Sequence, residues 1–74
     1  MTEQLITRNP AIAAGKPILR GTRVSVEFVI GLMADGWTTA DILEGYPRLS
    51  KEQIEACLRY ALDLLESEKI SPAA

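Results

Sequence analysis

Three segments in the second part of the chain carry apolar residues at helical spacing. The first, residues 26–35, places four apolar side chains on one face: Phe28, Val29, Leu32 and Met33. Residues 38–45 and 50–68 show the same kind of pattern, and the last segment is the longest. The spacing therefore predicts three helices, of which the second and third form a helix-turn-helix.

Each predicted helix begins at a residue that can cap it. Ser25 precedes the first helix, and its hydroxyl can accept a hydrogen bond from an unpaired N–H of the first turn. Thr38 and Ser50 stand at the starts of the second and third helices. Asp41 and Gln53, each three residues further on, complete the pattern of a capping box. These signals place the three helix starts.

The residues before the first helix, 5–24, are interpreted as an extended arm. Two short β-prone runs, residues 5–7 and 18–19, are separated by turn-forming residues. Gly21 and Thr22 then predict a structural turn, with an unusual φ at Gly21 and a backbone hydrogen bond from Thr22; a recognition loop is the alternative. The arm is a short two-stranded sheet that must pack on the helices or on a second chain, because so small a sheet is marginal alone.

Length and composition allow one small domain. The 74 residues divide into the arm (5–24), the tri-helical part (25–68) and a tail (69–74) that we expect to be disordered. At 47% apolar residues and a mean hydropathy of +0.07, the chain is too apolar to be disordered throughout. No apolar run approaches the ~20 residues needed to cross a bilayer, and no secretory signal is visible. We expect a cytoplasmic protein without membrane contact.

The residue types argue against an enzyme. The chain contains no histidine, which excludes His-dependent nucleophilic triads and His-ligated metal sites within it. Cys57 is the single cysteine, and its place on the apolar side of the last helix indicates a small buried hydrophobe rather than a reactive thiol. We therefore expect no catalytic residue, no metal and no cofactor.

Basic residues gather in the arm of an otherwise acidic chain. The net charge is −2 and the pI about 5.0, which removes the strongly basic balance typical of a nucleic-acid-binding protein. Residues 1–40 nevertheless carry four bases against three acids. The alternative is that the arm charges are solvated surface residues, with Arg23 paired to an acid on a helix. The candidate contacts to a partner or to DNA are Arg8, Lys16, Arg20, Arg23, Arg48 and Lys51.

The longest helix has more apolar surface than one core can cover. Its apolar residues spread over roughly 200°, whereas packing on a single core needs a stripe only a little wider than ~100°. A small domain with such a helix is expected to form a homodimer, through the long helices, the arms or both, or to bind another protein. The candidate interface residues are Leu58, Tyr60, Leu62 and Leu65.

The rest of that helix is acidic. Its exposed side holds four acids and one base: Glu52, Glu55, Arg59, Asp63 and Glu66. In a helix-turn-helix protein this helix would enter the major groove, where an acidic side is repelled by the phosphates. The far end of the helix is therefore not expected to contact DNA.

The chain resembles a prokaryotic family over residues 6–65. The landmarks are Gly15-Lys16-Pro17-Ile18, residues 20–24, 32–36 and 41–50, and the stripe from Ile54 to Ala61. They look like the domain of unknown function 433, which is often described as antitoxin-like. The resemblance implies a mainly α fold: a three-helix, homeodomain-like helix-turn-helix domain preceded by a short two-stranded β arm. It also implies a role as the antitoxin beside a PIN-like nuclease toxin.

Two classes of function follow, both non-enzymatic. The first is an antitoxin that binds a PIN-like nuclease and also represses its operator DNA. The second is a dimeric transcriptional regulator that binds double-stranded DNA through residues 50–53 and the basic arm. An adaptor with another partner is a third possibility. The acidic side of the long helix favours protein binding over sequence-specific DNA binding.

Overall fold

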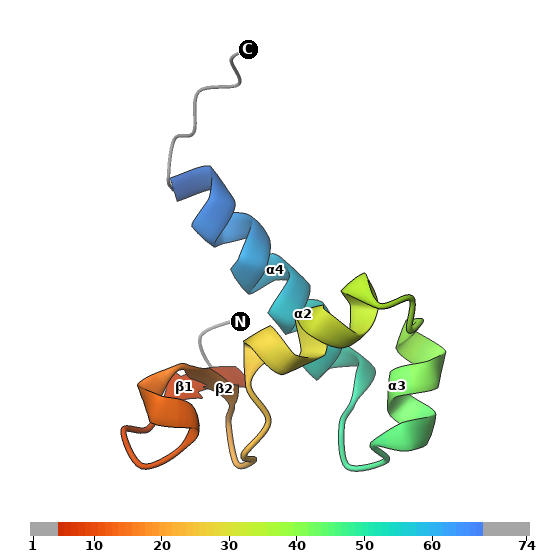
Figure 1. The fold of residues 1–74 in the computed structure, drawn as a ribbon, viewed down its shortest axis with the longest axis horizontal. Coiled ribbons are helices and arrows are strands. Elements are labelled where there is room, and N and C mark those ends of the chain that lie inside the picture. Colours follow the sequence, from red (N-terminus) through yellow and green to blue (C-terminus); the bar gives the residue numbers. More distant parts are fainter. Residues whose placement is uncertain (1–4, 68–74) are drawn as a thin grey trace.

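The fold is mainly α, with three helices and a two-stranded arm at the N-terminal side (Figure 1). A computed structural model describes residues 5–67. In chain order the elements are β1 (Ile6–Arg8), a 3₁₀ turn η1 (Ala13–Gly15), β2 (Pro17–Leu19), α2 (Val26–Ala34), α3 (Thr39–Gly45) and α4 (Lys51–Ser67). The predicted fold class is confirmed, and each strand or helix boundary lies within one residue of its expected position. The predicted tail, residues 69–74, lies outside the described residues.

The arm is an antiparallel pair of strands that packs on the helices. Ile6 pairs with Leu19 and Arg8 with Pro17. Ile6, Ile18 and Leu19 are buried, and Ile6 and Leu19 belong to the main core. A sheet of three residues per strand is marginal in water, so this burial against the helices is what holds it in place.

A left-handed turn between the strands was not predicted. Ala13 and Ala14 have φ values of +52° and +56°, and Gly15 follows at +81°. Alanine in this region costs roughly 1–2 kcal/mol per residue, because its Cβ approaches the following carbonyl oxygen. The amide of Lys16 closes the turn by donating to the Ala13 carbonyl oxygen at 3.0 Å.

The predicted helix caps are confirmed. The Ser25 hydroxyl accepts from the Phe28 amide at 2.9 Å, at the start of α2. Thr38 and Asp41 form a reciprocal capping box on α3. On α4 the Ser50 hydroxyl accepts from the amide of Gln53, whose side chain in turn accepts from the Ser50 amide at 2.8 Å.

One core holds the elements together. α2 packs against β2 and α4, and α3 packs against α4. The fully buried side chains come from four elements: Leu19, Val29, Ile42, Ile54 and Cys57. The sequence placed Phe28 on the same apolar face as Val29, but its side chain does not point into this core. It is 44% exposed and its ring meets Tyr46 edge-on, with centroids 5.7 Å apart. Val26, two positions earlier, is buried at the start of α2 instead.

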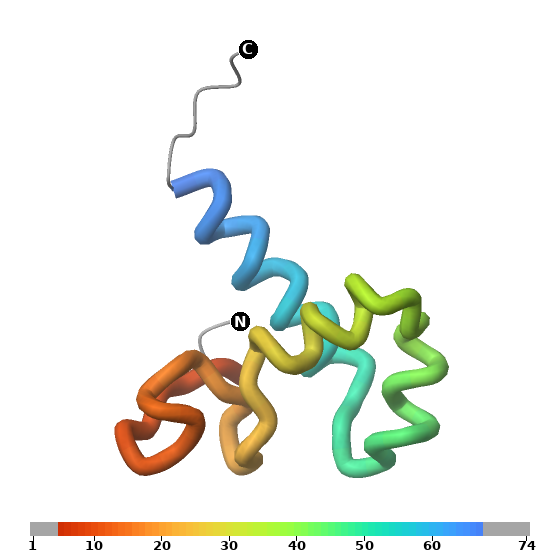
Figure 2. Tube along the Cα trace, in the orientation of Figure 1, coloured from red at the N-terminus to blue at the C-terminus, as the bar shows by residue number. Residues whose placement is uncertain are grey.

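The C-terminal half of α4 extends beyond the rest of the domain. Figures 1 and 2 show it running away from α2, α3 and the arm. All buried residues of α4 lie in its N-terminal half, whereas Leu62, Leu64 and Leu65 are exposed. Within the described residues, α4 thus carries more apolar side chains than the core of its own domain buries, as the sequence predicted.

The buried side chain of Leu19 gives a test of whether the arm and helices unfold together. We expect Leu19→Ala to lower the free energy of unfolding by about 2–5 kcal/mol, because it leaves a cavity between β2 and the helices. Urea denaturation followed by circular dichroism measures this change. Leu64→Ala, at an exposed position of α4, should cost far less. If helix unfolding is unchanged in Leu19→Ala, the arm is not part of the cooperative core.

Candidate binding surfaces

Four arginines from three separate segments of the chain line one groove. Two adjoining hollows share Gly21, Thr22, Arg23 and Arg48 in their walls. The larger has a volume of about 840 Å³ and also includes Arg20; the smaller, about 560 Å³, includes Arg8. We call the combined surface the arginine groove; its bases are Arg8, Arg20, Arg23 and Arg48. The structure thus brings together four of the six basic candidates.

A tight turn positions two of these arginines. The Leu19 amide donates to the Val24 carbonyl oxygen at 2.9 Å, which closes the chain between β2 and α2. Inside this turn the Thr22 hydroxyl donates to the Leu19 carbonyl oxygen and accepts from the Val24 amide, at 2.8 and 3.0 Å. Gly21 has a φ of +80°, a conformation that suits glycine. The turn holds its flanking residues, Arg20 and Arg23, at the groove.

The loop between α3 and α4 supplies the opposite wall. The Leu49 amide donates to the Tyr46 carbonyl oxygen at 2.9 Å, and Leu49 is buried in the core. Together with the capping box at Ser50, this contact fixes the loop and carries the exposed Arg48 to the groove. In Figure 1 this loop and the turn at Gly21 lie on the same side of the molecule, away from the end of α4.

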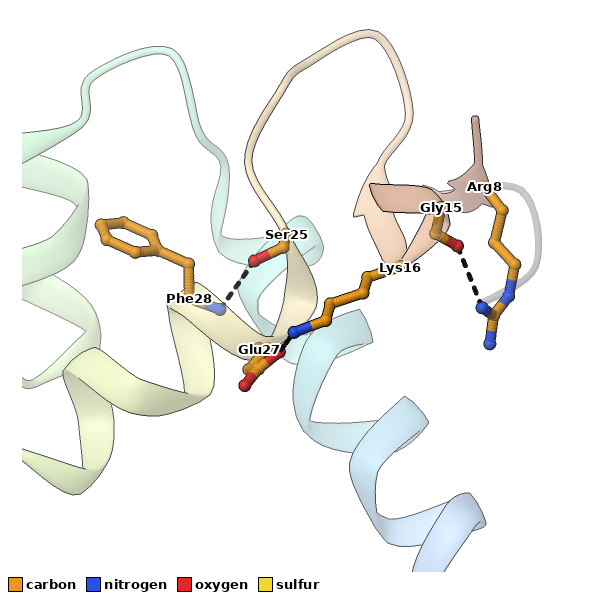
Figure 3. A network of polar contacts seen from close by, with 6 residues as sticks. All are labelled: Arg8, Gly15, Lys16, Ser25, Glu27 and Phe28. Carbon is orange, nitrogen blue, oxygen red and sulfur yellow. Dashed lines mark hydrogen bonds and ion pairs between the residues drawn. The ribbon is translucent and has the colours of Figure 1, made fainter. Parts of the chain in front are cut away.

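The arginine groove is strongly positive. None of the residues that line its two hollows is acidic. Arg8 donates to two neutral acceptors, the Gly15 carbonyl oxygen at 3.1 Å and the Tyr60 hydroxyl at 3.2 Å, which orient its guanidinium without neutralising it (Figure 3 shows the first). Arg23 and Arg48 have no hydrogen-bond or ion-pair partner within residues 5–67. Such a groove can bind carboxylates or phosphates bidentately.

The two lysine candidates lie outside the groove. The Lys16 ammonium is 2.8 Å from a Glu27 carboxylate oxygen, and Figure 3 shows this pair beside the start of α2. The hydrogen bond and charge of Lys16 lower the pKa of Glu27, although both side chains are largely exposed. Lys51 is exposed in the first turn of α4 and lines neither hollow.

A second surface is a row of leucines on α4. Leu58, Leu62 and Leu65 are 46%, 42% and 59% exposed and follow one another at helical spacing; we call them the leucine stripe. Tyr60, also an interface candidate, does not belong to it: it lies roughly 160° from Leu62 around the helix and packs against the core. Its hydroxyl accepts the hydrogen bond from Arg8, a role that no local sequence signal indicated.

Three aromatic side chains lie together where α2 and α3 meet. The Trp37 ring lies against Gly45, where an added Cβ would be 3.3 Å from the Trp37 Cζ3 atom. Its centroid is 6.3 Å from that of Tyr46, which also contacts Phe28. Trp37 therefore covers the junction between the end of α2 and the end of α3.

Two features could supply chemistry among the described residues, a cluster of metal-ligating side chains and the cysteine thiol. Across residues 5–67 no group of three or more metal-ligating side chains comes together. Cys57 is buried, and burial raises the pKa of its thiol from 9.0 to about 11. Its thiolate population at neutral pH is therefore negligible. Over the same range, no helix is both long and apolar enough to cross a membrane.

Comparison with known proteins assigns the family. The family model described as "Protein of unknown function (DUF433)" matches residues 6–61, more than half of the chain. The chain belongs to the DUF433 family. The match spans the arm, α2, α3 and the N-terminal half of α4, and so includes every residue of the arginine groove.

Two relatives are longer than this chain. The uncharacterized protein y4eO of Sinorhizobium fredii is 38% identical over 58 residues, which cover 78% of this chain and 26% of y4eO. A crystal structure of a DUF433 member protein from Anabaena variabilis is similar with a TM-score of 0.80 and 25% identity, over 88% of this chain and 64% of that one. This chain thus spans about a quarter of the curated relative and under two thirds of the solved one.

The buried thiol predicts a pH dependence of stability. Because the pKa of Cys57 is higher in the folded protein than its ordinary 9.0, the folded state retains the proton more strongly between pH 9.0 and about 11. We expect the free energy of unfolding to fall over this range, and to fall less steeply in Cys57→Ala. Urea denaturation of both proteins at a series of pH values gives the difference. Identical slopes would contradict the assignment.

Proposed function

We propose that this protein is a non-enzymatic binding protein, the antitoxin of a toxin–antitoxin pair, which binds a PIN-like nuclease toxin. The observation that supports this proposal is the arginine groove, where four bases converge without one acidic residue in the lining. A metal-dependent nuclease positions its metal ions with carboxylates, so its active-site groove is acidic. Arginines are suited to such carboxylates because each guanidinium can make two parallel hydrogen bonds.

The groove is built to bind rather than to react. Its walls are two loops fixed by backbone hydrogen bonds and by the burial of Leu19 and Leu49, so Arg23 and Arg48 are held on a rigid base. The two hollows are lined by hydrogen-bond donors, and no carboxylate, imidazole or thiol that could act as a general base or nucleophile lines them. Positioned positive charge of this kind complements an acidic nuclease site and favours rapid, specific association with it.

A second candidate function, binding to operator DNA, is favoured by the position of the groove. Gln53, in the first turn of α4, lines the groove next to Arg48. In a helix-turn-helix protein the N-terminal turn of this helix faces the major groove, and neighbouring bases contact phosphates. The acids Glu55, Asp63 and Glu66 further along the exposed side of α4 restrict any such contact to the first turn, which itself carries Glu52.

Affinity capture tests the proposal. The tagged protein is recovered from a lysate of its own host with and without nuclease treatment, and the eluate is analysed for protein and DNA. We expect one small PIN-like nuclease in stoichiometric, nuclease-resistant amount. Recovery of defined DNA without a protein would favour the regulator, and recovery of an unrelated protein would favour an adaptor.

Charge reversal in the groove locates the contact. We expect Arg23→Glu and Arg48→Glu each to weaken toxin binding by about tenfold or more, because each replaces a guanidinium with a charge that repels carboxylates. Titration of purified toxin, followed by calorimetry, measures the loss. Lys16→Glu is the matched control, since Lys16 is an exposed arm base outside the groove, and it should leave the affinity nearly unchanged.

Binding to a DNA duplex gives the complementary measurement. If phosphates occupy the groove, the affinity for an operator duplex falls with salt at a slope of about −0.9 per neutralised phosphate, and Arg23→Glu reduces that slope. Loss of DNA binding in the groove variants together with unchanged toxin binding would refute the proposed toxin contact.

A further inference from the structure

Within residues 5–67 the leucine stripe of α4 is an exposed apolar surface, and Leu5 of the arm lines an open hollow beside Leu58 and Leu62. Leu58, Leu62 and Leu65 are spaced by four and three residues, so they form a continuous row along one side of the helix. The row is not part of the core, since every buried residue of α4 lies at or before Cys57. This spacing is that of the contact positions in a two-stranded helical pair.

We propose that a second copy of this chain covers Leu62 and Leu65 of the stripe, with the C-terminal halves of the two α4 helices packed antiparallel about a two-fold axis. The axis passes between Leu62 and Leu65. Leu62 of one copy then packs beside Leu65 of the other, and the reverse contact follows by symmetry. The two domain bodies lie at opposite ends of this contact, because the paired halves extend beyond their own domains (Figure 1).

Charge complementarity selects this register. Arg59 and Glu66 each follow a leucine of the stripe by one residue, so both lie on the same flank of it. In an antiparallel pair, each flank of one helix lies against the same flank of the other helix. When Leu62 packs beside Leu65, Arg59 of one copy therefore lies beside Glu66 of the other copy. Symmetry makes this ion pair twice. Neither side chain has an ion-pair partner among the residues that the structure describes.

The alternative pairings lack this match. If the helices slide so that Leu58 packs beside Leu62, Arg59 meets Arg59 of the other copy and Glu52 meets Glu66, so both flanking contacts are repulsive. A parallel pair places Arg59 and Glu66 opposite the flank that holds Ile54 and Ala61, where no charge can pair with them. Both antiparallel registers pair two leucines across the axis, and only the register with Leu62 beside Leu65 also pairs opposite charges.

The experiment is sedimentation equilibrium of the full chain over a range of concentrations, with charge-swap variants. The wild type is expected to be a dimer. Arg59→Glu and Glu66→Arg each place like charges together at both symmetric contacts, and each should weaken dimerisation by about tenfold or more at low salt. The double variant Arg59→Glu/Glu66→Arg restores the pairs in reversed order and should regain most of the affinity.

Two leucine variants distinguish dimerisation through the leucine stripe from nonspecific association through other exposed apolar residues. Leu62→Glu places a charge at the centre of the contact and should give monomers. Leu64→Glu is the matched control: Leu64 is 49% exposed on the same helix but lies roughly 160° from Leu62, so its variant should remain dimeric. Circular dichroism verifies that each variant keeps its helix content.

Three results would overturn the proposal. The first is a wild-type protein that stays monomeric at about millimolar concentration. The second is a dimer that both single charge variants leave intact, or that the double variant fails to restore. The third is a dimer that Leu64→Glu disrupts and Leu62→Glu does not. The outcome is independent of the toxin and DNA measurements, since no residue of the arginine groove is changed.

Discussion

The first two turns of α4 provide the surface on which everything else packs. Ile54 and Cys57 are completely buried there, and α2 and α3 both contact this helix while β2 reaches the core through Leu19. In so short a chain one core must support three helices and a sheet, and the free energy from its few buried side chains is correspondingly small. The capping box at Ser50 fixes the start of α4 directly before the turns that carry Ile54 and Cys57.

Both binding surfaces follow from this arrangement. The loops that enter and leave the core, one at Gly21 and one at Arg48, meet on one side and gather the arginines. Within residues 5–67, the part of α4 that continues past the core leaves Leu62, Leu64 and Leu65 exposed. Charge and apolar area are therefore separated to different ends of the molecule, so that one surface can be occupied without blocking the other.

Local signals in the sequence were enough to predict the positions of the helices and strands. The caps at Ser25, Thr38 and Ser50 depend on residues three positions apart, and the same short range applies to the apolar spacing of α4. The left-handed turn at Ala13 and Ala14 could not be predicted, because alanine disfavours that conformation and only the surrounding structure imposes it.

The candidate site could be predicted only in part, because its contacts are long-range. The arginines were identifiable as a basic arm, but Arg48 meets Arg23 only after α2 and α3 have folded between them. The hydrogen bond from Arg8 to Tyr60 joins residues 52 positions apart. Which lysine is neutralised also depends on tertiary structure, since Lys16 reaches Glu27 across the junction of the arm and α2.

The projection of α4 beyond the domain has a consequence for how strongly the protein holds its targets. In the proposed dimer, two copies joined at their projecting ends present one arginine groove at each end of the pair. A target long enough to span the pair, with two matching anionic sites, is then held by both grooves, and once the first is engaged the second binds at a high effective concentration. Such avidity lets two weak, salt-sensitive contacts act as one tight complex, and it is lost when the helices separate.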